Sequence, residues 1–404
     1  MQDPEVLGGV SHTGGVDHPA PASDDAFIPP ENPEVASATQ HVLKSGDTFI
    51  VNDSLGDITG IDDGLFVNDT RVLSSLRLTF GGRVPSLLSG SVSSDNTAFT
   101  AHLTNRPLPP LGGTSTPEGA IHVQRTRVLS GTMMTEAIQL TNYGTTDAVV
   151  PLSISFSSDF RDMFEVRGLK RDRQGTVEAP RIEDGGVCLD YIGLDRVARR
   201  VRVAFSPTPQ KLLADRADYT VELPAQACVP VYLTVVVTVE PLPGVAPDTP
   251  SASIVRPPQS TTVKTNGRRV GRSAMRAALV DAHIVMRERR RATARIRSSN
   301  PLFNAWINRS LADLGLLTSD LPTGPYPYAG IPWFSTPFGR DAVITSLQTL
   351  WLQPHLAAGV LRFLADHQAH ENSPFRDAAP GKIMHEMRKG EMAATGEVPF
   401  ALYY

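Results

Sequence analysis

The pattern of apolar and polar residues changes character beyond the midpoint of the chain. From residue 40 to residue 240 it consists of short runs rich in β-branched residues, separated by Gly, Pro, Asn and Asp. The runs include DTFIVND (47–53), RVLSSLRLTF (71–80), EAIQLTN (136–142), VVPLSISFS (149–157), RRVRVAFSP (199–207) and VYLTVVVTVE (231–240). Strands at such intervals are typical of two packed antiparallel sheets, so we predict a β-sandwich over residues 40–240.

The last part of the chain has a helical period instead. Its apolar stripes are Phe303, Ile307, Leu311 and Leu314, widened by Leu302 and Trp306; then Val343, Ile344, Leu347, Leu350 and Trp351; then Leu356, Val360, Phe363 and Leu364. Long loops are predicted over 319–340 and 369–404. Because wide apolar faces must pack against one another, we predict all-α hairpins in a bundle or toroid over residues 268–404.

Two segments lack the apolar pattern of a packed element. Residues 1–39 are rich in Pro, Gly, Asp and Ser and have neither the basic start nor the apolar core of a signal peptide, so we expect a disordered tail. Residues 241–267 combine several prolines with Ser, Thr and Gly, which predicts a linker between the sandwich and the helices.

Composition and charge narrow the class of protein. The chain has 404 residues and a net charge of −4, which favours several domains and gives no overall reason to expect a nucleic-acid or membrane partner. No apolar run approaches the ~20 residues that would span a bilayer. With two cysteines, Cys188 and Cys228, a chain of this size is expected to be reduced and cytoplasmic.

A basic stretch interrupts this neutral balance. Residues 264–297 hold eleven Lys and Arg residues against Asp281 and Glu288. Nucleic-acid binding would explain the charge, but no aromatic residue is interleaved for base stacking. We therefore favour a solvated helix face that joins two domains.

The segment IPWFSTPFGRDA (331–342) is the main candidate for chemistry. It places Trp333, Phe334 and Phe338 beside Arg340 and Asp341 at the start of a predicted helix. A carboxylate in a first helical turn meets the positive end of the helix dipole, which would explain Asp341 but not the aromatic residues. Sugars present apolar C–H faces to aromatic rings and hydroxyls to an Arg–Asp pair. We therefore predict that these five residues bind a sugar.

Neighbouring loops add further candidates. TGPYPYAG (323–330) contributes Tyr326 and Tyr328. GKIMHEMRKGEM (381–392) contributes Lys382, His385, Glu386, Arg388 and Glu391, although a capped, solvated turn would also explain it. A zinc-binding HExxH helix would need histidine at position 389, which is Lys389, so no metal is predicted. The chain has no phosphate-binding loop, dinucleotide fingerprint or GxSxG motif, and no cofactor is expected.

Residues 299–352 and the segment GKIMHEMRKGEMAATGEVPF (381–400) resemble the bacterial amylo-alpha-1,6-glucosidase (glycogen debranching) family. GLFVNDTRVLSSLRL (64–78) and DFRDMFEVRGLKRDRQG (159–175) are similar to the β-sandwich that precedes its catalytic domain. The resemblance implies an (α/α)6 toroid of six hairpins behind the sandwich and hydrolysis of α-glucan ends, chiefly α-1,6-linked. By the same resemblance, Arg340 and Asp341 would hold sugar hydroxyls, Trp333 and Phe334 would shape the subsite, and Glu386 and Arg388 would form a second wall.

The chain departs from the family pattern near its end. Ala401 and Leu402 stand where relatives tend to carry Gly-Arg, and the family's general acid follows a YYGSVD-type motif that would begin at Tyr403. We therefore expect an incomplete toroid without a catalytic residue inside residues 1–404, with Glu386 as the fallback acid, and no turnover by this chain alone. Two alternatives stay open: a non-catalytic carbohydrate-binding or scaffold protein, and a phosphorylase or transglucosidase on the same architecture.

Overall fold

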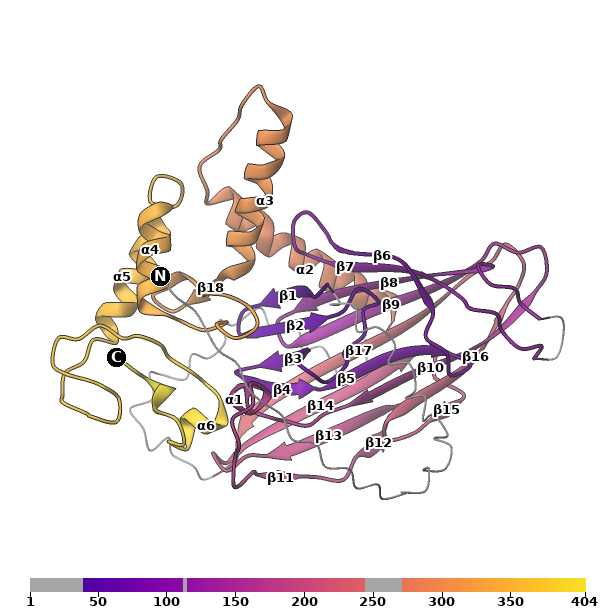
Figure 1. Ribbon diagram of the computed structural model, residues 1–404, viewed down its shortest axis with the longest axis horizontal. Coiled ribbons are helices and arrows are strands. Elements are labelled where there is room, and N and C mark those ends of the chain that lie inside the picture. The colour runs from indigo at the N-terminus through magenta and orange to yellow at the C-terminus, as the bar shows by residue number, and fades with distance from the viewer. Residues whose placement is uncertain (1–38, 112–114, 244–270) are drawn as a thin grey trace, which may run out of the picture. The chain divides into compact units, whose positions relative to one another are not determined.

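Antiparallel strands make up most of the chain as far as Pro241. The computed structural model describes residues 39–111, 115–243 and 271–404 (Figure 1). The predicted tail (1–39) lies outside the described residues apart from residue 39. The predicted linker (241–267) lies outside them apart from residues 241–243.

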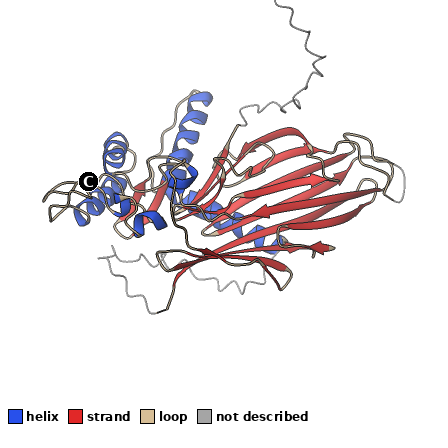
Figure 2. Ribbon diagram, turned by 60° about the horizontal axis from the view of Figure 1, so that its bottom comes forward, coloured by secondary structure: helices blue, strands red, loops and turns tan. Residues whose placement is uncertain are grey.

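The largest sheet has nine strands. Along its main path the order is β11-β13-β14-β17-β9-β8-β7-β6, and β12 pairs with β13. The bounds are β6 Ser86–Val92, β7 Phe99–Thr104, β8 Ile121–Ser130, β9 Met133–Asn142, β11 Thr176–Val177, β12 Arg181–Glu183, β13 Gly186–Ile192, β14 Val197–Ser206 and β17 Cys228–Pro241. The long strands run side by side in Figure 2. All these pairings are antiparallel.

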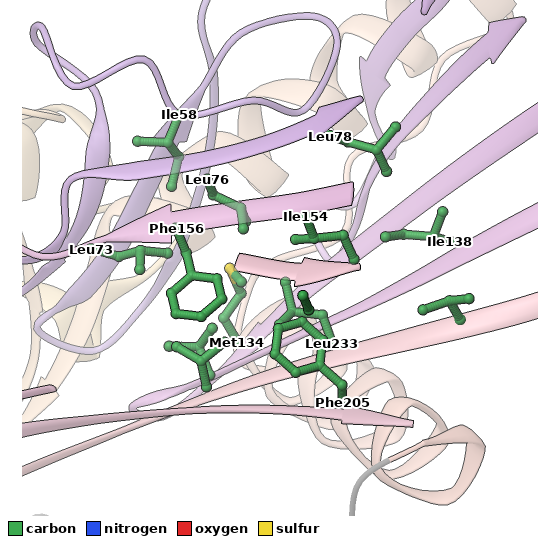
Figure 3. Close-up of a cluster of buried hydrophobic side chains, with 14 of the residues drawn as sticks. Ile58, Leu73, Leu76, Leu78, Met134, Ile138, Ile154, Phe156, Phe205 and Leu233 are labelled. Atoms are coloured by element: carbon green, nitrogen blue, oxygen red, sulfur yellow. The ribbon is translucent and has the colours of Figure 1, made fainter. Parts of the chain in front are cut away.

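Two four-stranded sheets provide the opposite layer. One has the order β1-β2-β3-β4 and the other β15-β16-β10-β5. Their bounds are β1 His41–Ser45, β2 Thr48–Asn52, β3 Gly64–Val67, β4 Thr70–Leu73, β5 Ser75–Phe80, β10 Ala148–Ser157, β15 Lys211–Leu212 and β16 Arg216–Leu223. A single apolar core draws side chains from both layers. Figure 3 shows part of it: Leu76 and Phe156 from one layer, Met134 and Leu233 from the other.

The alternation of side chains along each strand explains this packing. In β7, Phe99, Ala101 and Leu103 are buried, while the residues between them are partly exposed. A strand with this period of two buries one face and presents the other to solvent or to another element. The prediction of an antiparallel β-sandwich is therefore confirmed.

Three charged side chains lie inside this core. Arg125 and Arg127 of β8 point to Glu136 of β9, with Nε–Oε distances of 2.6 and 3.0 Å. Arg125 also pairs with Asp57, in the connection between β2 and β3. Burial alone would raise the pKa of Glu136, but the two guanidinium groups hold it below its ordinary value. The network thus ties the connection after β2 to the large sheet.

A short helical region follows the sandwich. Its elements are α2 Arg272–Arg291, α3 Pro301–Leu317, β18 Thr318–Leu321, β19 Gly324–Pro327, α4 Gly339–Gln348, α5 Pro354–Asp366, α6 Glu391–Ala394 and the 3-10 turn η1 Pro399–Ala401. The three predicted stripes do form helices, except that Leu350 and Trp351 lie in the turn after α4. However, 319–340 is not only a loop, because it contains the hairpin β18–β19, and 369–404 contains α6 and η1. No described helix is long and apolar enough to cross a membrane.

The structure does not show the toroid that the resemblance implies.

Helix α2 packs on the outer face of the large sheet, where Met275 and Ala278 contact Val128 and Ala137. The part of the basic stretch that is described therefore has a packed apolar side and a mainly exposed charged side.

The helices α4 and α5 differ in burial. An incomplete toroid should leave the apolar side chains of Leu347, Trp351, Val360 and Leu364 partly unburied. Leu347 of α4 and Trp351, in the turn just after it, are indeed 72% and 67% exposed. The expectation is wrong for Val360 and Leu364 of α5, because both are almost fully buried. Helix α5 packs against β19, and the Phe363 ring lies 4.8 Å from the ring of Tyr326. The hairpin that the sequence did not reveal thus covers α5.

Glu136→Gln should lower the free energy of unfolding by about 3–5 kcal/mol, because it leaves two buried guanidinium groups with too little counter-charge. Urea denaturation of the purified chain measures this change. Glu183→Gln is the matched control, since Glu183 pairs with Arg181 at the surface and its loss should cost less than about 1 kcal/mol. Equal effects of the two substitutions would contradict the structural role of the buried network.

Candidate functional site

An open pocket of about 470 Å³ lies beside the start of α4. Three segments far apart in the sequence contribute its lining: Gly339, Arg340, Val343 and Ile344; Ile383, Met384 and His385; and Tyr403 and Tyr404. The pocket thus brings together the first turn of α4, the 381–392 segment and the end of the chain.

Backbone hydrogen bonds hold these three segments together. The amide of Gly339 donates to the carbonyl of His385 at 2.9 Å, and the amide of His385 donates to the carbonyl of Tyr403 at 2.6 Å. A Cβ atom at position 339 would lie 2.1 Å from the carbonyl oxygen of Met384. Only glycine permits so close an approach, so Gly339 sets the distance between α4 and the 381–392 segment.

Arg340 and Asp341 supply the charged groups at the pocket. The Arg340 side chain is 69% exposed, and its Nη2 lies 3.2 Å from Oδ2 of Asp341. Asp341 occupies the first turn of α4, where no side chain caps the helix. Its position suits both an interaction with the helix dipole and a contact with a ligand in the pocket.

Aromatic rings extend from the pocket along the preceding loop. His385 lies edge-on to Phe338 and to Tyr403, with ring centroids 5.6 and 6.1 Å apart. Phe334, which is exposed, lies edge-on to Phe338 at 5.8 Å. Phe338 itself is buried, so the rings that a ligand at the pocket could contact are those of His385 and Tyr403.

The structure places only some of the predicted sugar-binding residues at the pocket. Arg340 and His385 line the pocket, and Asp341, Phe338 and Glu386 adjoin it through the contacts above and the backbone bridges of Glu386 to Phe338 and Tyr403. Trp333 packs instead on the sandwich beside Phe66 and Met163, and Lys382 forms an ion pair with Asp377 at 2.7 Å.

Arg388 also lies away from the pocket, against the sandwich. Its side chain is 1% exposed. Nη1 lies 3.2 Å from Oδ1 of Asp69, Nε lies 3.2 Å from Oε2 of Glu386, and Nη2 donates to the carbonyl of Trp333 at 2.8 Å. This geometry makes Arg388 a positioning residue that joins the sandwich to both loops near the pocket.

Two carboxylates of the sandwich accept hydrogen bonds from backbone amides just after Arg388. Asp69 sits in the turn between β3 and β4, where it and Asn68 have positive φ, a conformation that Asn and Asp tolerate. Asp69 accepts from the amide of Lys389 at 3.0 Å, and Asp162 accepts from the amide of Met392 at 3.1 Å. Burial raises the pKa of Asp162 to about 7.

Glu391 and Tyr328 also form hydrogen bonds with the sandwich, and Tyr326 is buried beside α5. Glu391 accepts from the hydroxyl of Tyr191 and from the amide of Leu194, both at 2.7 Å. Tyr326 and Tyr328 are buried rather than displayed in a binding loop, which corrects that prediction. The Tyr328 hydroxyl donates to Asp47 of the sandwich at 2.6 Å.

Reasoning from the sequence missed the apolar part of the pocket and its last tyrosines. Val343 and Ile344 belong to a predicted packing stripe, and Ile383 and Met384 carry no chemical signal of their own. The Tyr403–Tyr404 pair was available as a signal, since it directly follows the 381–400 segment. Among residues 39–111, 115–243 and 271–404, no group of three His, Cys, Asp or Glu side chains is placed to hold a metal ion.

Residues 43–234 match the protein family described as the N-terminal domain of (some) glycogen debranching enzymes. The β-sandwich is thus related to a domain found in glycoside-processing enzymes, and a glucan is the class of substrate which that family implies. No curated protein matches the chain.

One solved structure supports the fold. A candidate kojibiose phosphorylase from the human microbiome is 10% identical, with a TM-score of 0.50, and the match covers 80% of this chain and 42% of that one. The chain therefore spans less than half the length of that relative. A candidate aldose 1-epimerase from Escherichia coli K12 is 9% identical over 50% of this chain and 99% of its own, with a TM-score of 0.29. At that TM-score the second likeness supports no conclusion.

Gly390→Ala should loosen the contact between the 381–404 segment and the sandwich. A Cβ atom there would lie 2.4 Å from Oδ2 of Asp162 and 3.2 Å from Cβ of Asp69. We expect faster proteolytic cleavage within residues 381–404, measured by mass spectrometry of limited digests. Gly330→Ala is the control, because a Cβ at Gly330 meets nothing within 4 Å. Cleavage at the rate of the unmodified chain would contradict the tight contact.

Asp162 should make stability depend on pH. Its pKa is about 7 in the folded chain and 3.8 ordinarily, so between these values the folded state holds a proton that the unfolded state releases. The contribution of this group to stability is therefore present at low pH and is lost as the pH rises towards about 7. Urea unfolding from pH 4 to pH 8 should show a gap between the unmodified chain and Asp162→Asn that shrinks as pH rises. A constant gap would contradict this assignment.

Proposed function

We propose that the pocket binds the terminal glucosyl unit of an α-glucan, and that the protein is a glycoside hydrolase of the glycogen-debranching type. It would release glucose from α-1,6-linked ends, and also from α-1,4-linked ends. The observation that carries the proposal is the Arg340–Asp341 pair beside the ring wall of Phe338, His385 and Tyr403. The family match of the sandwich supports the choice of a glucan.

Each group has a role in this proposal. The guanidinium of Arg340 and the carboxylate of Asp341 hold adjacent sugar hydroxyls through charge-assisted hydrogen bonds. His385 and Tyr403 contact the C–H face of the ring. Glu386, oriented by Arg388, binds sugar as well and is the fallback general acid.

Hydrolysis requires one carboxyl group that protonates the leaving oxygen and a second carboxylate, ~6.5–9.5 Å away in inverting enzymes and ~5–5.5 Å away in retaining ones. We propose that α3, α4 and α5 are the first helices of an (α/α)6 toroid. Exposed apolar residues such as Trp306, Leu347 and Trp351 would then face further hairpins, and the catalytic carboxylates would come from there. One alternative is a non-catalytic carbohydrate-binding protein, which would make the same contacts to the sugar but lack the catalytic carboxylates.

Phosphorolysis on the same architecture is the other alternative. A phosphorylase would need a cationic site for phosphate, whereas Arg340 in the pocket is already paired with Asp341. We therefore favour water as the acceptor. Incubation of a longer version that includes the further hairpins with branched dextrins, with and without phosphate, separates the possibilities: free glucose indicates hydrolysis, glucose 1-phosphate indicates phosphorolysis, and binding without product indicates a carbohydrate-binding protein.

Arg340→Ala should weaken the binding of maltotetraose about 10- to 100-fold, because it removes charge-assisted hydrogen bonds to sugar hydroxyls. Titration calorimetry on the 404-residue chain measures the affinity. Arg216→Ala is the control, because Arg216 forms a partly exposed pair with Asp218 on the sandwich. Unchanged affinity in Arg340→Ala would remove the pocket from sugar binding.

Asp341→Asn distinguishes the ligand role from the helix role. If Asp341 binds sugar, affinity falls while the free energy of unfolding changes by less than about 1 kcal/mol, the size of a helix-dipole interaction. A variant that is destabilised by more than about 1 kcal/mol but binds maltotetraose normally at temperatures where it is folded would assign Asp341 to the helix instead.

A further inference from the structure

The outer face of the nine-stranded sheet carries a second feature that the pocket does not use. On strands β7, β8 and β9 the outward positions follow from the alternation of burial and the strand register. Away from α2, they are Thr100, His102, Thr104, His122, Gln124, Thr126, Gln139 and Thr141. We call this set the neutral face, because it contains four threonines, two glutamines and two histidines and no Asp, Glu, Lys or Arg.

The register brings these side chains together in rows across the sheet. Gln124 pairs with His102 on one side and with Gln139 on the other. The next row joins Thr104, His122 and Thr141. Since neighbouring strands lie about 4.8 Å apart, each row is a line of hydrogen-bonding groups spaced by about that distance.

A cluster of rings marks one end of the neutral face. His102 and His122 are stacked, with ring centroids 5.2 Å apart, and a hydrogen bond of 3.1 Å joins Nδ1 of His102 to Nε2 of His122. Tyr143 follows directly after β9, is 64% exposed, and its ring centroid lies 6.2 Å from that of His122. The Tyr143 amide donates to the carbonyl of Ala120 at 2.9 Å, which fixes its backbone.

Several polar groups of the neutral face have hydrogen-bonding capacity to spare. Each histidine uses one ring nitrogen in the mutual bond and keeps the other. Burial and the neighbouring His102 lower the pKa of His122, which favours the uncharged form of this ring. The amide of Gln139, which is exposed, makes no side-chain hydrogen bond to any described residue.

From these observations we propose that the neutral face with Tyr143 is a second glucan-binding surface, which holds a chain segment of the polysaccharide rather than its end. Uncharged hydroxyl, amide and imidazole groups match the hydroxyls of a neutral glucan, and the Tyr143 ring offers a stacking surface for one sugar. The choice of a glucan rests on the proposed function, whereas the position of the surface does not.

Other ligands fit this surface less well. Nucleic acid and anionic lipid need Lys or Arg at the contact, and none stands among the outward positions of the neutral face. A protein partner would be expected to bury a cluster of large apolar or Arg side chains at the centre of the contact. Here the centre presents Thr, Gln and His, and the exposed Tyr143, Leu87 and Leu88 lie at its margins. A neutral polysaccharide is the remaining class that matches both the charge and the hydrogen bonds.

Native gel electrophoresis of the 404-residue chain through glycogen tests the proposal. Glycogen should retard the unmodified chain. Tyr143→Ala and Gln139→Ala should each weaken this retardation, the former about tenfold in apparent Kd, the effect of losing one ring contact. Ile182→Ala is the control, because Ile182 is an exposed apolar side chain at the opposite edge of the same sheet.

The pocket variant Arg340→Ala separates this surface from the proposed active site. It should keep most of the retardation by glycogen while it loses the binding of maltotetraose. The absence of retardation in the unmodified chain, or full retardation in both face variants, would overturn the proposal. Loss of retardation in Arg340→Ala alone would also overturn it and would leave the proposed function standing. If only the face variants lose binding and Arg340→Ala changes neither assay, the proposed function fails instead.

Discussion

The arrangement of the pocket depends on one buried guanidinium. Arg388 lies where the sandwich, the Trp333 loop and the 381–404 segment meet, and its side chain is almost completely enclosed. A buried cation is costly unless it is paired and hydrogen-bonded, so the three groups that surround it cannot move apart independently. Asp69 belongs to the sandwich, Glu386 adjoins the pocket, and the carbonyl of Trp333 belongs to the loop that leads into α4. One side chain thus couples the sandwich to the site.

Further carboxylates of the sandwich also hold the 381–404 segment in place. Asp69 and Asp162 accept from the backbone of residues 389 and 392, and Asp47 pairs with Lys389. Glu391 completes the contact from the other side, through Tyr191. Because these bonds fix backbone atoms, they also fix the residues just before them, which form one wall of the pocket. The sandwich is therefore a scaffold for the site as well as a domain with its own core.

Several features could be predicted from the sequence because they depend on local patterns. The alternation in runs such as RVLSSLRLTF is enough to indicate strands, and the stripe from Leu356 to Leu364 is enough to indicate a helix. The hairpin β18–β19 escaped prediction because TSDL and GPYP are short, contain two prolines and owe their pairing to tertiary packing. Tyr326 of this hairpin packs against Phe363 of α5. The hairpin therefore covers α5, which is why Val360 and Leu364 are less exposed than an incomplete toroid would leave them.

The sequence indicates which loops form the candidate site, but not which of their residues contact the sandwich. Arg340, Asp341 and His385 do gather at one pocket, since a polar and aromatic loop at a helix start is an unusual local pattern. The role of Arg388 depends on a partner more than three hundred positions away, Asp69, and no local pattern reveals such a contact. Trp333 was misplaced for the same reason, because the apolar surface that it contacts belongs to the sandwich.

The central claim is that the sandwich fixes the pocket through the Asp69–Arg388 contact. Hydrogen exchange of the amides of Gly339, His385 and Tyr403 in Asp69→Asn tests it most directly, because these three amides join the pocket segments and none bonds to Asp69 itself. We predict that all three amides exchange at least about tenfold faster in the variant than in the unmodified chain, since the loss of a buried charge partner costs more than about 1.4 kcal/mol. Faster exchange confined to Lys389, with unchanged rates at Gly339, His385 and Tyr403, would contradict the account.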